Sequence, residues 1–277
     1  MYKNADIVVA TMHKKEEAIS GPFHQAFNAK MHLPNDFDTD QFGTFTGEVE
    51  RSDTPYNTVI NKAKAALREC DFHFAVANEG SFGPHPAIFL MPADIELISF
   101  VDNVNNITVV ESGVFPETNY AHLDIRKNDD YSAFLSNVKF GTHGLIIRTV
   151  NDKMIVAKGV LGMQDLKRYL SQAFMKDDQV RLETDMRAMM NPTRMGVIQK
   201  LTNKLVVRLQ RQCRQCDLPG FGKVSVAGNL ACELCAGSTE LYRNKILSCV
   251  KCDYQEIHPR DDGLTSADPK HCNNCNP

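Results

Sequence analysis

Residues 213–275 have the sequence CRQCDLPGFGKVSVAGNLACELCAGSTELYRNKILSCVKCDYQEIHPRDDGLTSADPKHCNNC, and their cysteines form four C-x2-C pairs. The pairs are Cys213/Cys216, Cys232/Cys235, Cys249/Cys252 and Cys272/Cys275. Only Cys70 lies outside this pattern. A tight C-x2-C turn brings two thiolates to one metal ion at about 2.3 Å, whereas secreted disulfide scaffolds are short and space their cysteines less regularly. The pattern predicts two four-cysteine sites that each hold a structural Zn²⁺ ion.

Spacing does not decide which pairs share an ion. The run 233–256 resembles a knuckle, strand, turn, strand and knuckle, which favours one ion shared by the two middle pairs. Sequential pairing of the first with the second and the third with the fourth is about as compatible with the spacing as this nested arrangement, and crossed pairing stays open. Two alternatives to zinc are eight reduced cysteines without metal and an iron–sulfur cluster. Proteins that bind iron–sulfur clusters more often show a denser run of cysteines.

Length and composition indicate an ordinary globular protein. The chain has 277 residues, 43% of them hydrophobic, and a formal net charge of -3. That charge offers no general basic surface for nucleic acid, and no apolar run approaches the ~20 residues of a membrane span. The first residues, MYKNADIVVATMHKKEE, predict a first strand rather than a secretory signal. We therefore expect a cytoplasmic protein with no membrane partner; the sequence leaves the oligomeric state open.

The rest of the chain predicts an α/β domain. Apolar runs predict strands at 6–11, 43–49 and 72–77 and a hairpin from 95–103 and 106–115, and residues 55–70 have helical periodicity. Asn191 and Pro192 suit the cap and the first turn of a long helix over about 192–212. We therefore expect an α/β domain at 1–210 with a mixed sheet and a zinc ribbon at 211–277.

One helix face of this domain is basic. Lys200, Lys204, Arg208 and Arg211 follow at helical spacing. We interpret them as a solvated face opposite the apolar one; contact with phosphate or RNA is the alternative. The ribbon itself has equal numbers of basic and acidic residues from 211 to 277, which argues against a phosphate-gripping surface there.

Three polar clusters of the α/β domain are candidate sites. The first is the strand-to-helix turn with Thr11, His13, Lys14 and Lys15. Backbone N–H groups and a helix dipole at such a turn attract an anion, and lysines add charge. The turn lacks the glycines of a P-loop, so an ordinary exposed helix start is the alternative.

The second cluster is NEGSFGPHP at 78–86. Glu79 follows a buried strand and precedes a glycine, so we expect its carboxylate at the strand end, where it could bind Mg²⁺. His85 lies a few residues further on. A solvated loop glutamate is the alternative.

The third cluster is ETDMRAMMNPTRM at 183–195, which contributes Asp185, Arg187, Asn191 and Arg194. Arginines between a strand and a capped helix suit bidentate recognition of phosphate or carboxylate. A salt-bridge network around the helix cap is the alternative interpretation.

The stretches DTDQFGTFTGEVER (38–51), NEGSFGPHP and ETDMRAMMNPTRM, together with the C-terminal cysteine pairs around PGFG, resemble a bacterial and archaeal family of uncharacterised proteins. The resemblance covers essentially the whole chain, and the ETDMRAMMNPTRM motif is specific. It implies membership of a domain family without an assigned activity.

Residues 5–120 also resemble the inosine/xanthosine triphosphate pyrophosphatase group. The shared features are the first strand with Thr11 to Lys15, a helix with Asn61–Ala63, Glu79-Gly80 and a hairpin. The resemblance implies that Lys15 contacts phosphates and that Glu79 binds Mg²⁺. This group has acidic residues just before its N-[KR]-A helix, and of these only Asp53 is present here. The metal site would therefore be lost, or rebuilt with Asp38, Asp40 or Asp185 as a metal ligand.

Together these features predict a Mg²⁺-assisted phosphoanhydride hydrolase of a nucleotide-like substrate. Its catalytic residues would be Lys15, Glu79, Asp185 and Arg187. The residues that bind the substrate would be Thr11, His13, Lys14, His85, Asn191 and Arg194. A non-catalytic nucleotide- or RNA-binding protein, whose zinc module docks a partner, is the alternative.

Overall fold

The computed structural model describes residues 1–34, 37 and 53–277. The chain divides into two compact units, Tyr2–Val206 and Val207–Pro277, and the boundary falls inside the last long helix. Within the described residues, no helix is both long enough and apolar enough to cross a membrane. The strand expected at 43–49 lies outside the described residues, as do Asp38 and Asp40.

The first unit contains a mixed five-stranded sheet with the order β2-β1-β3-β4-β5. Strand β1 pairs in parallel with both β2 and β3, and the β3-β4-β5 meander is antiparallel. The expected mixed α/β architecture and the expected hairpin near 103–106 are confirmed. The strands are β1 (Asp6–Ala10), β2 (Lys30–His32), β3 (Phe74–His85), β4 (Ile88–Asp102) and β5 (Ile107–Phe115).

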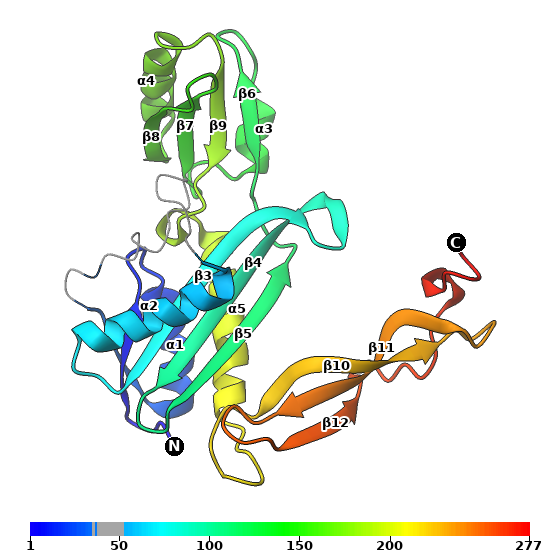
Figure 1. Cartoon of the computed structure of the whole chain (residues 1–277). Coiled ribbons are helices and arrows are strands. Elements are labelled where there is room, and N and C mark those ends of the chain that lie inside the picture. Colours follow the sequence, from blue (N-terminus) through cyan, green and yellow to red (C-terminus); the bar gives the residue numbers. More distant parts are fainter. Residues whose placement is uncertain (35–36, 38–52) are drawn as a thin grey trace. The chain divides into compact units, whose positions relative to one another are not determined.

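Helices cover both faces of this sheet: α2 (Pro55–Glu69) lies in front of it in Figure 1, and α1 (Glu16–Phe27) lies behind. Val59 and the buried alanines of α2 pack in one core cluster with Ala75, Ala77 and Val101. On the other face, the Phe23 ring of α1 stacks on Phe100 at 6.0 Å between centroids. Because side chains alternate along a strand, neighbouring residues of β3 and β4 face different helices.

A second sheet of the same unit has the order β6-β9-β7-β8, with every pairing antiparallel. Its core joins the sheet to α3 (Ser132–Asn137) and α4 (Met163–Phe174), with Leu145, Leu166 and Leu182 fully buried. The strands are β6 (His122–Ile125), β7 (Leu145–Thr149), β8 (Ile155–Val160) and β9 (Val180–Thr184).

After β9 the chain makes a 3-10 turn at Ala188–Met190 and enters α5 (Pro192–Leu209). The Asn191 side chain accepts a hydrogen bond from the Arg194 backbone N–H at 3.0 Å, so the expected cap is present. The helix ends at Leu209, slightly before the expected end near residue 212.

The second unit contains an antiparallel sheet with the order β10-β11-β12. The strands are β10 (Gly222–Ala231), β11 (Ser238–Ser248) and β12 (Gln255–Pro259). The start of β10 lies opposite the end of β11, as Gly222 pairs with Ser248. This register places the cysteine pairs at the two ends of the sheet.

Candidate functional site

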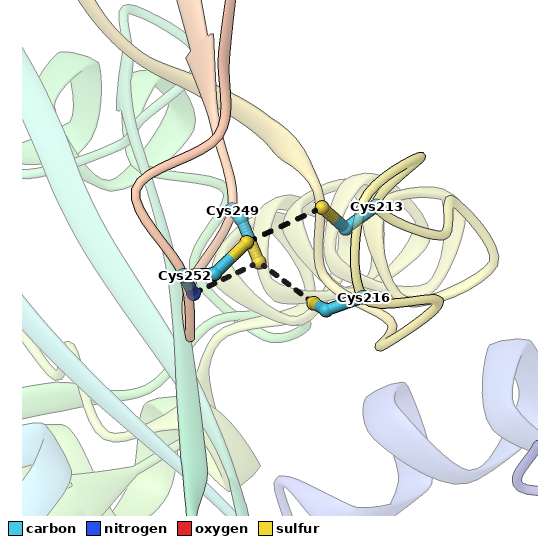
Figure 2. A group of neighbouring side chains, drawn as sticks. All are labelled: Cys213, Cys216, Cys249 and Cys252. Atoms are coloured by element: carbon cyan, nitrogen blue, oxygen red, sulfur yellow. Dashed lines mark hydrogen bonds between the residues drawn. The ribbon is translucent and has the colours of Figure 1, made fainter.

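The cysteines form two tetrads, in each of which the four sulfur atoms lie within 4.8 Å of one another. Figure 2 shows the first, where two loops point their thiols toward a common centre. The members are Cys213, Cys216, Cys249 and Cys252 in the first tetrad and Cys232, Cys235, Cys272 and Cys275 in the second. The structure therefore supports the expected C-terminal module with cysteine clusters that can hold metal ions.

The pairing is crossed: the first pair meets the third, and the second meets the fourth. The arrangement favoured from the sequence, with the middle pairs sharing an ion, is wrong, and so is the sequential one. The cause is the β10-β11 hairpin. Its open end carries the first and third pairs, while its turn carries the second pair. An isolated bridge between Cys232 and Ala267 then brings the fourth pair to that turn.

The sulfur–sulfur distances between different C-x2-C pairs are close to those of a tetrahedral metal site. The Sγ–Sγ distances are 3.7 Å for Cys213–Cys252 and 3.6 Å for Cys216–Cys249. In the second tetrad they are 3.9 Å for Cys232–Cys275 and 3.6 Å for Cys235–Cys272. Four Zn–S bonds of about 2.3 Å in a tetrahedron require ~3.8 Å between sulfurs. The geometry is therefore consistent with zinc.

Backbone donors favour the thiolate form of one cysteine in each tetrad. The N–H groups of Lys251 and Cys252 donate to Cys249 Sγ at 3.3 and 3.4 Å. Burial opposes the thiolate, but these donors lower the pKa of Cys249 to about 7. In the second tetrad, N–H groups of Asn274 and Cys275 lower the pKa of Cys272 to about 7. A ready thiolate is what a metal ligand requires.

Buried charges form a second candidate site on the five-stranded sheet. Glu79 lies within β3, which continues to His85, so the expected strand end at Glu79-Gly80 is wrong. The glycine-rich run 80–83 stays extended because it pairs with β4 throughout. Glu79 faces α2, and its carboxylate accepts from Lys62 Nζ at 2.6 Å. The two side chains are each 8% exposed, so the pair is buried.

The neighbouring residues of β3 face the other side of the sheet. There Asn78 donates to Glu96 Oε2 at 2.8 Å, and Arg194 Nε of α5 donates to Glu96 Oε1 at 2.7 Å. Arg194 also donates to the Met186 carbonyl at 2.6 Å, and its guanidinium lies 4.9 Å from the centre of the Phe82 ring. The guanidinium of Arg194 is thus engaged within the protein.

Gly80 lies where this ion pair crosses β3. A Cβ atom at residue 80 would be 2.5 Å from Glu96 Oε1 and closer still to an Arg194 nitrogen. The pair therefore requires a glycine at this position.

Lys15 joins the two groups of charges. Its Nζ donates to the Asn78 carbonyl at 3.2 Å, which is possible because β1 and β3 are parallel neighbours. Burial lowers the pKa of Lys15 to about 7, and the charge of Arg194 adds to this effect. The Glu79 carboxylate acts on both Lys15 and Arg194. Lys15, Glu79 and Arg194 are therefore electrostatic neighbours.

Asp94 on β4 completes the cluster. Burial raises the pKa of Asp94 to about 8, and the adjacent Glu96 carboxylate contributes to this rise. Asp94 Oδ1 and Asn78 Oδ1 are buried without a hydrogen-bond partner in the part of the chain that the structure describes. We define the buried charge cluster as these residues: Lys15, Lys62, Asn78, Glu79, Asp94, Glu96 and Arg194.

Further predicted site residues lie outside this cluster. Asp185 is fully buried and binds the Arg187 guanidinium through both carboxylate oxygens, with a shortest distance of 2.6 Å. Asn191 caps α5 and donates to Asn119 at 2.8 Å. These contacts form a network around the helix cap. Both arginines of the motif, Arg187 and Arg194, bind groups of the protein itself.

The remaining predicted residues lie near the surface. Thr11 and His13 are half-buried in the turn before α1, and Lys14 is exposed with a φ of 57°. His85 ends β3, and its Nδ1 accepts from the Ala87 N–H at 3.1 Å. The turn residues adjoin Lys15 in sequence.

The basic face of α5 is only partly solvated. Lys200 pairs with Glu117 and Lys204 with Glu111, both at 2.8 Å. Arg208 is buried, and its Nε donates to the Gly220 carbonyl at 2.9 Å. Three residues of this basic face therefore contact acidic or carbonyl groups of the protein.

Sequence reasoning missed three members of the buried charge cluster. Lys62 belongs to the buried face of α2, and Asp94 and Glu96 occur in an apolar strand, PADIELISF. A charged residue at a core position was the available signal, because such residues are rarely buried unless paired.

Residues 62–277 match the model of a family described as Domain of unknown function (DUF6671). No curated protein matches the sequence. The match covers most of the chain, so the protein belongs to this family, and the expected membership of a family of unknown function is confirmed.

Proposed function

We propose that this member of the DUF6671 family hydrolyses a phosphoanhydride bond in a nucleotide-like substrate at the buried charge cluster. The observation that carries the proposal is the gathering of six buried ionisable side chains around strands β3 and β4: three carboxylates come from these strands, and three cations come from α2, α5 and the turn before α1. Burying such charges is unfavourable unless they are closely paired, and strongly shifted pKa values concentrate at functional sites. Lys15 and Asp94 have pKa shifts in opposite directions.

In the proposed reaction, the oxygen of a water molecule bonds to a phosphorus atom, and the bridging P–O bond breaks with its electron pair on the leaving phosphate. The protons of the water pass to the phosphate products or to solvent. The turn at Thr11, His13 and Lys14 would bind the substrate phosphates beside Lys15. Lys15 in its protonated form would stabilise negative charge that develops on the phosphoryl oxygens. Resemblance to the inosine/xanthosine triphosphate pyrophosphatases supports these roles.

Mg²⁺ would be held by Glu79. A bound Mg²⁺ would supply charge neutralisation at the phosphates. A carboxylate oxygen is a ligand that Mg²⁺ prefers. In the structure the Glu79 carboxylate is paired with another cation, because Lys62 Nζ lies 2.6 Å from its Oε2. Mg²⁺ and Lys62 would thus compete for one carboxylate. We assign Asp185 and Arg187 to supporting the start of α5 rather than to catalysis, because they bind each other.

The tetrads would hold zinc as a structural metal, since all four positions at each ion are protein ligands. Thiols kept for metal require a reducing compartment, so we propose the cytoplasm as the location.

A non-catalytic module that binds a nucleotide or RNA is the second candidate, with the zinc module docking a partner. It is favoured by the internal pairing of Glu79 with Lys62 and of Glu96 with Arg194. These pairs would make the cluster a rigid support for a binding surface.

The test is a panel of nucleoside triphosphates with and without Mg²⁺, run as a hydrolysis assay and as a thermal-shift screen. Glu79→Gln removes the charge and keeps the shape. Glu111→Gln is the matched control, because Glu111 is similarly buried on the same sheet and also pairs with a lysine. Turnover that is lost in Glu79→Gln and kept in Glu111→Gln supports the hydrolase. Stabilisation without turnover supports the binding module, and the absence of both contradicts the hydrolase and the binding of a nucleotide.

A further inference from the structure

The second sheet of the first unit carries a cavity that the proposed function does not use. Its volume is about 560 Å³, within the ~300–1,000 Å³ range of small-molecule sites. One wall is a single face of α4, where Lys167, Leu170, Ser171 and Phe174 follow at helical spacing. The opposite wall is the loop after β6, which contributes Lys127 and Tyr131.

The floor of the cavity is apolar. Leu170 is 5% exposed and belongs to the hydrophobic core of this sheet. The half-buried rings of Tyr131 and Phe174 pack against the same core. A ligand that enters the cavity would therefore meet aliphatic and aromatic surface below and beside it.

The mouth of the cavity is cationic. Lys127 and Lys167 are exposed, and neither ammonium has an ion-pair or hydrogen-bond partner among the described residues. No acidic side chain lines the cavity within that part of the chain. The nearby carboxylates are engaged locally: Asp129 accepts from the Arg126 N–H, Asp130 accepts from the Ser132 N–H at the start of α3, and Asp165 pairs with Arg168.

These features select one class of ligand. A cation would face two lysines without a carboxylate. A wholly apolar molecule would leave both ammonium groups unused, and a small inorganic anion would leave the apolar floor in water. We propose that the cavity binds an amphipathic organic anion, with its charged head at Lys127 and Lys167 and its apolar body on Leu170 and the two rings.

The proposal can be tested with 8-anilinonaphthalene-1-sulfonate, an anion with an aromatic body whose fluorescence rises on binding, added to the zinc-loaded full chain. We expect one molecule bound per chain. Replacing both lysines (Lys127→Gln with Lys167→Gln) should weaken binding roughly tenfold, because two charge contacts are lost. The neutral analogue N-phenyl-1-naphthylamine should bind the wild type and this double variant equally.

Two further variants keep the test specific. Ser171→Phe places a ring in the cavity and should abolish binding of both probes while the melting temperature is retained. Lys64→Gln removes an exposed lysine of α2 and should change nothing. Equal binding of the anionic probe by wild type and the double lysine variant would overturn the proposal, and so would binding that survives Ser171→Phe.

Displacement of the probe identifies the head group. Decanoate and decyl phosphate have the same apolar chain, and the one that displaces the probe at lower concentration carries the preferred head. Failure of both to displace it would show that the ligand class is wrong.

Discussion

Gly80 permits a sharp test of the buried ion pair between Glu96 and Arg194. In Gly80→Ala, the new Cβ would be 2.5 Å from Glu96 Oε1 and 2.7 Å from its Cδ, and it would overlap an Arg194 nitrogen. Neither partner can move freely, because the two side chains are 0% and 5% exposed and the guanidinium also holds the Met186 carbonyl. The substitution should therefore separate the pair.

The expected magnitude follows from burial. Separating a buried ion pair so that a charge loses its partner costs about 3–5 kcal/mol. Gly83→Ala is the matched control on the same strand, since a Cβ there meets no atom within 4 Å. Without a clash, a Gly→Ala change at an ordinary φ stabilises by about 0.4–1 kcal/mol through the unfolded chain. Gly80→Ala should thus be at least ~3 kcal/mol less stable than Gly83→Ala, or roughly 6–12 °C lower in Tm for a unit of this size.

The assay is urea and thermal unfolding of the zinc-loaded chain, followed by circular dichroism. If the clash is the cause, the penalty of Gly80→Ala should nearly disappear in a Glu96→Ala/Arg194→Ala background, which a double-mutant cycle measures as coupling. Equal stability of Gly80→Ala and Gly83→Ala would refute the reasoning, and an unchanged penalty in that background would do the same.

Three further predictions concern different parts of the molecule. Elemental analysis of protein prepared without chelator should give about two Zn²⁺ per chain, one for each tetrad, and Cys249→Ser should retain about one; well under one zinc in the wild type, or iron, would contradict the assignment. Replacing Lys200 and Lys204 with Gln should change the free energy of unfolding by no more than ~1 kcal/mol, because both lysine side chains are exposed. Arg208→Gln should cost about 1–3 kcal/mol, because it removes the hydrogen bond to the buried Gly220 carbonyl. Equal effects of the two changes in urea unfolding would contradict this prediction. The pKa of Asp94 is about 8 in the folded protein and ~3.9 in an unfolded chain. Between these two pH values the folded protein keeps a proton that the unfolded chain releases. The stability that this group contributes is therefore fully present below pH ~4 and is lost as the pH rises to about 8. Asp94→Asn should therefore flatten the decline in unfolding free energy between about pH 5 and 7, and an unchanged slope would show that Asp94 holds no such proton.

Local sequence signals predicted some features well. The C-x2-C pairs identified the cysteines that gather in the two tetrads, because a knuckle is formed by its own few residues. Asn191 and Pro192 identified the start of α5 for the same reason, since capping involves only neighbouring residues.

Features that depend on strand pairing were not predictable in this way. Gly80 and Gly83 suggested a loop, but pairing with β4 keeps this run extended, and alternation then places Glu79 against Lys62. The cysteine partners were likewise decided by the register of β10 on β11 rather than by spacing. The role of Glu96 depends on an arginine nearly a hundred residues away in the sequence.

The crossed pairing has a consequence for synthesis. A nascent chain cannot complete the first coordination sphere until residue 252 has been made, by which time Cys232 and Cys235 of the second site have also been made. Those thiols must then wait for residues 272 and 275. Until those residues are available, Cys232 and Cys235 have only half of their partners and are open to oxidation or to capture of a wrong ion, so the second site stays chemically vulnerable for longer than the first.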